Sequence, residues 1–188
     1  LGERYGYARG DALRLADLLH KLDRMHKPTI ARVQGSAFGG GVGLVACCDI
    51  VVAAREAQFC LPEVRLGLIP ATISPYVVQA IGARASRRYF MTAERFGADE
   101  ARRLGLVSEV VDADALDATV AKFAEQLLMG GPHALAASKD LISTVADKPI
   151  DASLMEITAH RIAHTRASTE GREGVMAFLE KRRAAWLP

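Results

Sequence analysis

Aromatic side chains are scarce in this sequence and make up 6% of its 188 residues. So few rings argue against a platform that stacks nucleic-acid bases. An excess of charge of one sign is also lacking: 24 basic residues face 22 acidic ones, for a formal net charge of +2. That balance argues against a protein that coats nucleic acid. The longest apolar run, residues 43–54, contains Asp49 and is too short to cross a bilayer. The sequence therefore predicts a globular protein that binds neither nucleic acid nor membranes.

Cysteine is rare too, with residues only at Cys47, Cys48 and Cys60. Two adjacent cysteines have poor geometry for a disulfide with each other. An odd number of cysteines among apolar neighbours predicts reduced, buried thiols and a cytoplasmic protein. A nucleophilic cysteine is not favoured, because no basic residue lies nearby in sequence to lower the pKa of a thiol.

The chain begins at Leu1 without a methionine, and no signal-peptide pattern follows. An amphipathic helix is predicted within the first dozen residues, from about residue 8 to residue 25. We therefore expect that the start was processed or trimmed, or that part of the domain is missing. The remaining length suffices for a sizeable core without disulfides or metals.

The first part of the chain alternates strands and helices. Strands are predicted at residues 29–33, 50–54, 58–60 and 106–111, and helices at 44–48, 74–81, 85–93 and 98–104. Ser74 before Pro75 is expected to cap a helix. From residue 114 onward the pattern is helical. We therefore predict an α/β domain over residues 1–111, incomplete at its N-terminus, and a helical region over residues 112–188.

A glycine-rich turn at residues 35–43 follows one predicted strand and precedes a helix. Such turns bring backbone N–H groups close to a phosphate or to an oxyanion that develops during a reaction. A tight turn that only permits close packing is the alternative. Residues 41–46 also fit a dinucleotide-binding pattern, with Glu63 as the later acid, but the next strand begins too soon for the helix this motif needs. A P-loop is excluded, because no Gly-Lys-Ser/Thr closes the run.

Several motifs, in conserved order and spacing, resemble the crotonase family of enoyl-CoA hydratases and isomerases. They are KPTIA at 27–31, GSAFGGG at 35–41, CDI at 48–50, AQF at 57–59, PEV at 62–64, LGLIP at 66–70, LGLV at 104–107 and EGVMAFLEKR at 173–182. The resemblance covers essentially the whole chain. It implies a crotonase-like ββα spiral core with a C-terminal helical trimerisation region.

The resemblance also implies a substrate and roles for particular residues. The substrate is an acyl-CoA thioester, whose coenzyme A is part of the substrate, and no separate cofactor is expected. Gly40 would donate its backbone N–H to the thioester oxyanion, and Glu63 would transfer the proton at the substrate carbon. The second oxyanion donor of the family lies upstream of this sequence. Substrate contacts are expected from Ala37, Phe38, Gly39, Gly40, Pro62, Leu66, Pro70, Phe178 and Lys181.

Two departures from the family pattern bear on the reaction. The second glutamate of the hydratases is replaced by Gly43, and the glycine-rich stretch after Pro70 is replaced by ATISPY at residues 71–76. Both resemble a subgroup that hydrates branched glutaconyl-CoA thioesters such as methylglutaconyl-CoA. We therefore expect a hydratase of α,β-unsaturated acyl-CoA. Two alternatives are a double-bond isomerase that uses one glutamate and a non-catalytic acyl-CoA-binding or structural subunit.

Other candidate sites are less specific. His160 and His164 lie one helical turn apart, but Arg161 stands where a zinc-protease motif requires glutamate, so no metal is expected. Basic faces around Arg84, Arg87 and Arg88 and around Lys181–Arg183 could meet the phosphates of CoA or be simply solvated. The apolar stripes of the helical region could bury against another subunit, and members of the family that the chain resembles typically form trimers or dimers of trimers. We therefore expect a homo-oligomer, a trimer or a dimer of trimers.

Overall fold

The computed structural model describes residues 2–187 of the chain, with side chains from residue 5 onward. It divides into two compact units, one made of the residues up to Met25 with Thr29–Ala121 and one made of His26–Pro28 with the residues from Lys122 onward. Among the described residues, no strand follows Val111. No helix between residues 2 and 187 has the length and apolar character needed to span a membrane.

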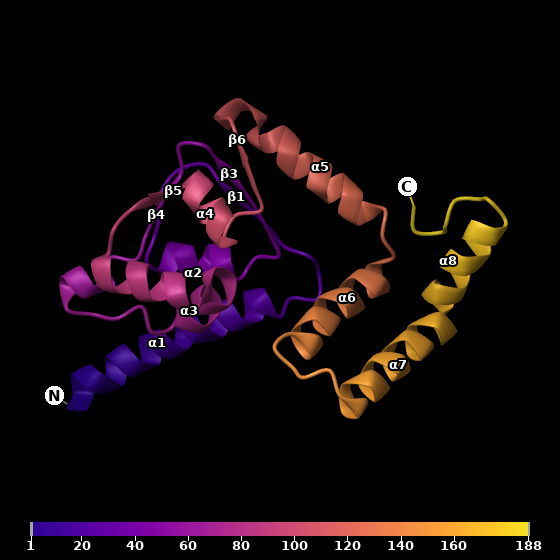
Figure 1. Cartoon of the computed structure of the whole chain (residues 1–188), viewed down its shortest axis with the longest axis horizontal. Coiled ribbons are helices and arrows are strands. Elements are labelled where there is room, and N and C mark those ends of the chain that lie inside the picture. The colour runs from indigo at the N-terminus through magenta and orange to yellow at the C-terminus, as the bar shows by residue number, and fades with distance from the viewer. Residues whose placement is uncertain (1, 188) are drawn as a thin grey trace. The chain divides into compact units, whose positions relative to one another are not determined.

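Helices and short strands alternate in the first unit (Figure 1). They are α1 (Gly2–Asp23), β1 (Ile30–Val33), β2 (Ala37–Phe38), α2 (Gly40–Ala46), β3 (Ile50–Ala54), β4 (Gln58–Cys60), the 3₁₀ helix η1 (Glu63–Leu66), α3 (Ser74–Thr92), β5 (Phe96–Gly97), α4 (Ala98–Leu104), β6 (Glu109–Val111), the 3₁₀ helix η2 (Ala113–Ala115) and the start of α5 (Leu116–Leu128). This order confirms the α/β class predicted from the sequence.

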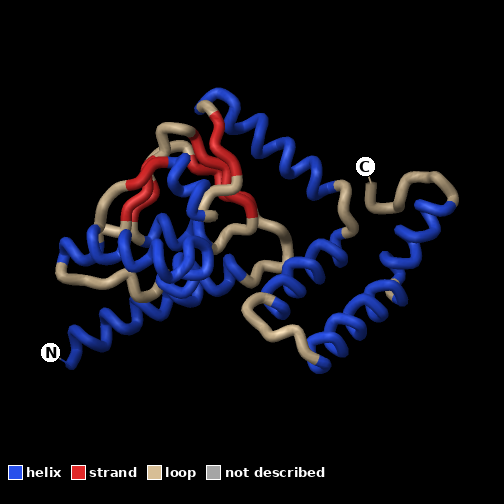
Figure 2. The backbone as a smooth tube through the Cα atoms, viewed as in Figure 1, coloured by secondary structure: helices blue, strands red, loops and turns tan. Residues whose placement is uncertain are grey.

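The strands form two three-stranded sheets, drawn red in Figure 2. One has the order β1-β3-β6 and is parallel throughout. In the other, β2 is parallel to β4, and β4 is antiparallel to β5. Helix α2 packs against β2, α1 and α3. Fully buried side chains of the core come from both sheets and from these helices, for example Leu19, Val42, Val52, Phe59 and Val77.

Several element boundaries differ from the sequence-based ones. Helix α1 begins at Gly2 rather than near residue 8, since an internal glycine weakens a helix without ending it. Strand β6 begins at Glu109 rather than at Leu106, because the N–H groups of Leu106 and Val107 both donate to the Ala101 carbonyl and close the end of α4. By contrast, the break predicted at Gly82 is present: Gly82 has a non-helical φ of 75° and ψ of 156°, so α3 consists of two helical segments that meet at a kink.

The prediction that Ser74 caps a helix is wrong. Ile73 occupies the N-cap position of α3, and no side chain caps this helix. The Ser74 hydroxyl instead donates to the Ala71 carbonyl at 2.8 Å, and the Ser74 N–H donates to the same carbonyl at 3.2 Å. Pro75 does stand in the first turn, as expected. The Ser74 hydroxyl therefore forms its hydrogen bond within the turn before α3 and does not cap the helix.

The second unit is helical. It contains the end of α5, then α6 (Pro132–Val145), α7 (Ala152–Ala167) and α8 (Thr169–Leu179). Asp151 and Ser168 cap α7 and α8 by accepting from Leu154 and Gly171, both at 2.9 Å. Helix α6 has no cap of its own, and Glu170 of α8 supplies one by accepting from the N–H groups of His133 and Ala134 at 3.0 and 2.7 Å.

Candidate active site

The site begins where two parallel strands end. Ala37 and Phe38 of β2 pair with Phe59 and Cys60 of β4, and the Gly39 N–H continues the ladder by donating to the Cys60 carbonyl at 2.9 Å. Because parallel strands have their carboxyl ends at the same edge, the segments that leave them start side by side. One segment is Gly39 and α2, and the other leads directly to Glu63.

Gly39 is required at this junction by its backbone and by its neighbour. Its φ of 50° with ψ of −117° lies in a region that side chains strongly disfavour. A Cβ built on Gly39 would lie 3.1 Å from Oε1 of Glu63, tighter than nine in ten real Cβ contacts. The carboxylate of Glu63 therefore lies beside the glycine turn.

One oxygen of the Glu63 carboxylate is buried and unpaired. Oε2 has no hydrogen-bond partner among the described residues, although the residue itself is only half-buried. A buried acceptor without a donor is costly and, in native proteins, often marks a functional group. The backbone holds Glu63 firmly, since its carbonyl accepts from the Leu68 N–H at 3.0 Å and η1 ends at Gly67 in the left-handed region.

Backbone donors are exposed next to this carboxylate. At the start of α2, the Val42 and Gly43 N–H groups both donate to the Gly39 carbonyl. The N–H groups of Gly40 and Gly41 find no backbone acceptor within residues 2–187, and Gly40 is exposed. A free N–H at Gly40, adjacent to the residue that touches Glu63, is the arrangement that an oxyanion donor needs.

Gly43, where the resemblance places a second glutamate, is buried one turn further along α2. A Cβ built there would lie 2.2 Å from Cγ2 and 2.7 Å from Cβ of Ile73. Ile73 was not among the residues predicted for the site, and its only signal in the sequence is its place in the ATISPY stretch at residues 71–76.

The other predicted contact residues fall into two groups. In the first unit, Ala37 and Pro70 are buried, Pro62 is half-buried, and Phe38 and Leu66 are exposed. In the second unit, Phe178 is 82% exposed, and Lys181 is exposed just past α8 with φ 55°. Of the predicted residues, the structure brings Gly39 and Glu63 together, and every predicted substrate contact stays a prediction.

None of the three cysteines forms a disulfide, and Cys47 and Cys60 are buried while Cys48 is partly exposed. Burial is the largest cause that raises the pKa of Cys47 to about 12, followed by the nearby Asp23. A thiol with so high a pKa is protonated at neutral pH and is a poor nucleophile. The interpretation of these residues as structural thiols is therefore consistent with the structure.

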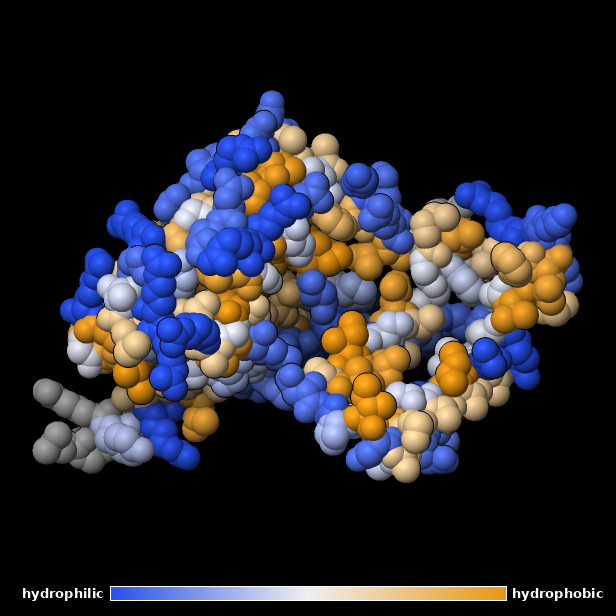
Figure 3. Space-filling view, viewed as in Figure 1, coloured by the Kyte–Doolittle hydropathy of each residue, from blue (hydrophilic) through white to orange (hydrophobic). Residues whose placement is uncertain are grey.

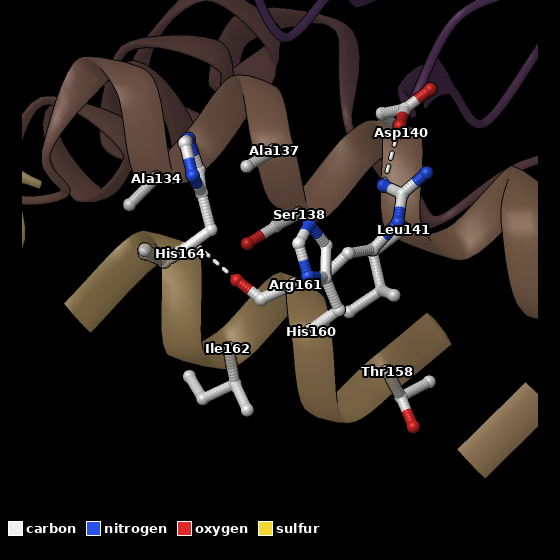
Figure 4. Close-up of a pocket in the computed structure, with 11 residues that line it drawn as sticks. Ala134, Ala137, Ser138, Asp140, Leu141, Thr158, His160, Arg161, Ile162 and His164 are labelled. Carbon is white, nitrogen blue, oxygen red and sulfur yellow. Dashed lines mark hydrogen bonds and ion pairs between the residues drawn. The ribbon is translucent and has the colours of Figure 1, made fainter. Parts of the chain in front are cut away.

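A hollow lies between α6 and α7 in the helical unit and has a volume of about 410 Å³ (Figure 4). His160 and His164 line it, and the Arg161–Asp140 ion pair spans the two helices beside it. Metal sites need more ligands than this pair, and no group of three or more histidine, cysteine or acidic residues comes together in the described part of the chain.

The two basic faces are partly neutralised. Arg84, Arg87, Arg88 and Arg103 line a shallow hollow of about 680 Å³, but Arg88 pairs with Glu94 and Arg103 pairs with Glu100. On the C-terminal face, Arg182 pairs with Glu173, and this hydrogen-bonded contact lowers the pKa of Glu173 to about 2. Arg88, Arg103 and Arg182 therefore serve local ion pairs.

Comparison with known proteins identifies the family to which this chain is similar. The model of the enoyl-CoA hydratase/isomerase family matches residues 4–187. The chain is 36% identical over 172 residues to carnitinyl-CoA dehydratase of Escherichia coli O157:H7, covering 89% of this chain and 66% of that protein. It is 37% identical over 167 residues to crotonyl-CoA hydratase of Syntrophomonas wolfei, covering 88% and 64%.

The fold agrees as well. The crystal structure of an enoyl-CoA hydratase from Shewanella pealeana superposes with a TM-score of 0.93 at 48% identity, covering 97% of this chain and 68% of that one. The chain spans slightly less than two thirds of the length of the two curated relatives. From the match over residues 4–187 and the shared fold, the chain belongs to the enoyl-CoA hydratase/isomerase family, the crotonases.

Proposed function

We propose that this protein acts on an acyl-CoA thioester, with Glu63 as its proton-transfer residue and the Gly40 N–H as an oxyanion donor. The observation that carries the proposal is the buried, unpaired Oε2 of Glu63 beside the glycine turn. A carboxylate kept from protein donors is free to exchange a proton with a ligand. The names of the two relatives, a dehydratase and a hydratase of CoA thioesters, support the same substrate class.

The reaction we favour is the addition of water to an α,β-unsaturated acyl-CoA. The oxygen of water forms a bond to the β-carbon while Glu63 takes one of its protons. The electron pair of the double bond moves toward the thioester and places negative charge on the carbonyl oxygen, where the Gly40 N–H stabilises it. Glu63 then gives a proton to the α-carbon, which completes the addition and restores the carboxylate.

Isomerisation of the double bond is the second candidate, and Gly43 favours it. A single carboxylate suffices for this reaction. Glu63 would remove a proton from the α-carbon of a 3-enoyl-CoA, form a dienolate, and return a proton to the γ-carbon. Both reactions need only proton transfer and charge stabilisation, so the proposal includes no metal or separate cofactor.

The proposal extends to substrate, assembly and compartment. A branched glutaconyl-CoA of the methylglutaconyl type is the acyl group we favour, from the motif at residues 71–76. We propose a cytoplasmic homo-oligomer, a trimer or a dimer of trimers. Apolar side chains exposed on the second unit support the assembly (Figure 3), among them Ile142, Met155, Val175, Phe178 and Leu179.

The test compares the wild type with Glu63→Gln on crotonyl-CoA, methylglutaconyl-CoA and a 3-enoyl-CoA. We expect the substitution to lower kcat by about 100-fold or more, the usual contribution of a general acid–base group. Glu56→Gln is the matched control, since Glu56 is exposed in the turn between β3 and β4. Unchanged turnover in Glu63→Gln would refute the role of Glu63. Tight CoA binding without turnover by the wild type would instead indicate a non-catalytic binding subunit.

A further inference from the structure

Helix α2 has no side chain at residue 43, and the space beside that residue is already filled. Gly40 and Gly43 are three residues apart, so they lie on the same face of the helix. A side chain on Gly43 would therefore project from the face that carries the proposed oxyanion donor. The atoms that occupy this space belong to Ile73, with Leu19 Cδ2 at an ordinary 3.6 Å from a Cβ built on Gly43.

Rotation of the Ile73 side chain does not open this space. A new rotamer would move Cγ2, which lies 2.2 Å from the built Cβ of residue 43. The Cβ of Ile73 would stay in place, because it is bonded directly to the backbone. Its distance of 2.7 Å from the built Cβ of residue 43 is still shorter than real Cβ contacts. A side chain at residue 43 therefore requires a shift of the backbone, either at Ile73 or in α2 itself.

The backbone at Ile73 is held on both sides. Ile73 is 2% exposed, and its carbonyl accepts from the Val77 N–H at 3.1 Å in the first turn of α3. The next residue, Ser74, is tied to the Ala71 carbonyl by its N–H and by its hydroxyl. Pro75 adds a fixed φ to the same turn. The segment that carries Ile73 is thus rigid where a shift would be needed.

We infer that Ile73 is a positioning residue that, by filling the space beside Gly43, limits the active site to the single carboxylate of Glu63. The inference deepens the proposed function and rests on it for its catalytic consequence. With one carboxylate, every proton that enters or leaves the substrate passes through Glu63. The hydration proposed above must then proceed with Glu63 alone and without a second acid to orient water, whereas isomerisation, which needs one carboxylate, loses nothing.

The packing part of the inference is tested by stability, without any substrate. Alanine normally stabilises a helix relative to glycine. Gly41→Ala should follow this rule, because a Cβ there meets only Ala37 Cβ at 3.8 Å. Gly43→Ala, two residues later in the same helix, should lower the urea midpoint of unfolding in the wild type. Ile73→Gly will be destabilising by itself because Ile73 is buried, but in its background Gly43→Ala should cost much less than in the wild type. If Gly43→Ala is as stable as Gly41→Ala, or if it costs as much in the Ile73→Gly background as in the wild type, the inference is wrong.

The catalytic part is tested with Gly43→Glu, Ile73→Gly and the double variant Gly43→Glu/Ile73→Gly. The ratio of hydration to isomerisation is measured on a matched pair of 2-enoyl- and 3-enoyl-CoA substrates. We expect this ratio to rise about tenfold or more only in the double variant, since a well-placed second acid–base group contributes at least that much. The inference would be overturned if Gly43→Glu alone raised the ratio as much as the double variant does. It would also be overturned if a folded double variant had the wild-type ratio.

The two proposals fail in different ways. A wild type without activity on either substrate would refute the proposed function, while the alanine and glycine variants would still decide the packing of Ile73 against Gly43. Should the double variant fail to fold, those stability measurements decide the inference.

Discussion

The carboxylate of Glu63 lies against Gly39, close enough that a Cβ on the glycine would stand 3.1 Å from Oε1. The two residues are 24 positions apart and meet because β2 and β4, the parallel strands that precede them, end at the same edge of one sheet. The contact joins the proposed proton-transfer group to the turn that presents the Gly40 N–H. Small changes at either residue should therefore affect both.

Gly39→Ala should reduce activity and stability together. The substituted residue would keep a φ of 50°, at a backbone cost of about 1–3 kcal/mol. The new methyl group would also press on the carboxylate of Glu63. Urea unfolding and kcat/KM on an enoyl-CoA measure the two effects. Gly35→Ala is the control, because a Cβ at Gly35 meets nothing within 4 Å and its φ is not positive. Equal losses in the two variants would contradict the argument.

Glu63→Leu should make the protein more stable while it removes turnover. The substitution eliminates a buried acceptor that lacks a donor, which typically costs about 1–3 kcal/mol in the folded state. We expect the free energy of unfolding to rise by about 1 kcal/mol, in line with the frequent trade of stability for function at active sites. Glu63→Gln, which keeps a polar group, should gain less. A less stable Glu63→Leu protein would mean that Oε2 has a partner in solution.

Glu170→Ala should loosen the start of α6. Glu170 accepts from the N–H groups of His133 and Ala134, and loss of a helix cap costs about 1 kcal/mol. Hydrogen exchange at these two amides should become faster, and the urea midpoint should fall. Glu170→Gln keeps an acceptor oxygen and should retain much of the protection. Unchanged exchange at Ala134 in Glu170→Ala would show that water replaces the cap at no cost.

Cys47 should resist alkylation that Cys48 undergoes. Iodoacetamide at pH 8, followed by mass spectrometry, should modify the partly exposed Cys48 first and should reach Cys47 and Cys60 only on unfolding. The reagent attacks the thiolate, and burial raises the pKa of Cys47 to about 12. Rapid modification of Cys47 in the folded protein would contradict its burial.

The same pKa predicts how stability changes with pH. The thiol is the neutral form, and its pKa rises from 9.0 to about 12 on folding. Its contribution to stability is therefore complete below pH 9.0 and is lost as the pH rises from there toward 12. The difference in unfolding free energy between the wild type and Cys47→Ala, measured from pH 7 to pH 10.5 by urea titration, isolates this contribution from other groups that titrate at high pH.

Part of the site was accessible from local sequence. The glycine run at 35–41 predicted the turn, because a glycine-rich stretch between a strand and a helix is a short-range signal, whereas the role of Glu63 in the PEV motif at 62–64 came from the resemblance to the crotonase family. The α/β class followed equally well from alternating patterns. The prediction for Ser74 was wrong. Ser-Pro is a common helix start, but the Ser74 hydroxyl donates to the Ala71 carbonyl in the preceding turn.

The sequence by itself determined the order of the elements, the family to which the chain belongs, and a glycine at residue 43, where the resemblance to that family places a second glutamate. Only the tertiary structure decided that Oε2 of Glu63 is buried without a donor and that Ile73 fills the space beside Gly43. Both facts depend on contacts between residues more than twenty positions apart. Local sequence patterns indicate which element each segment forms. Which side chains come into contact depends on the packing between segments that are distant in sequence.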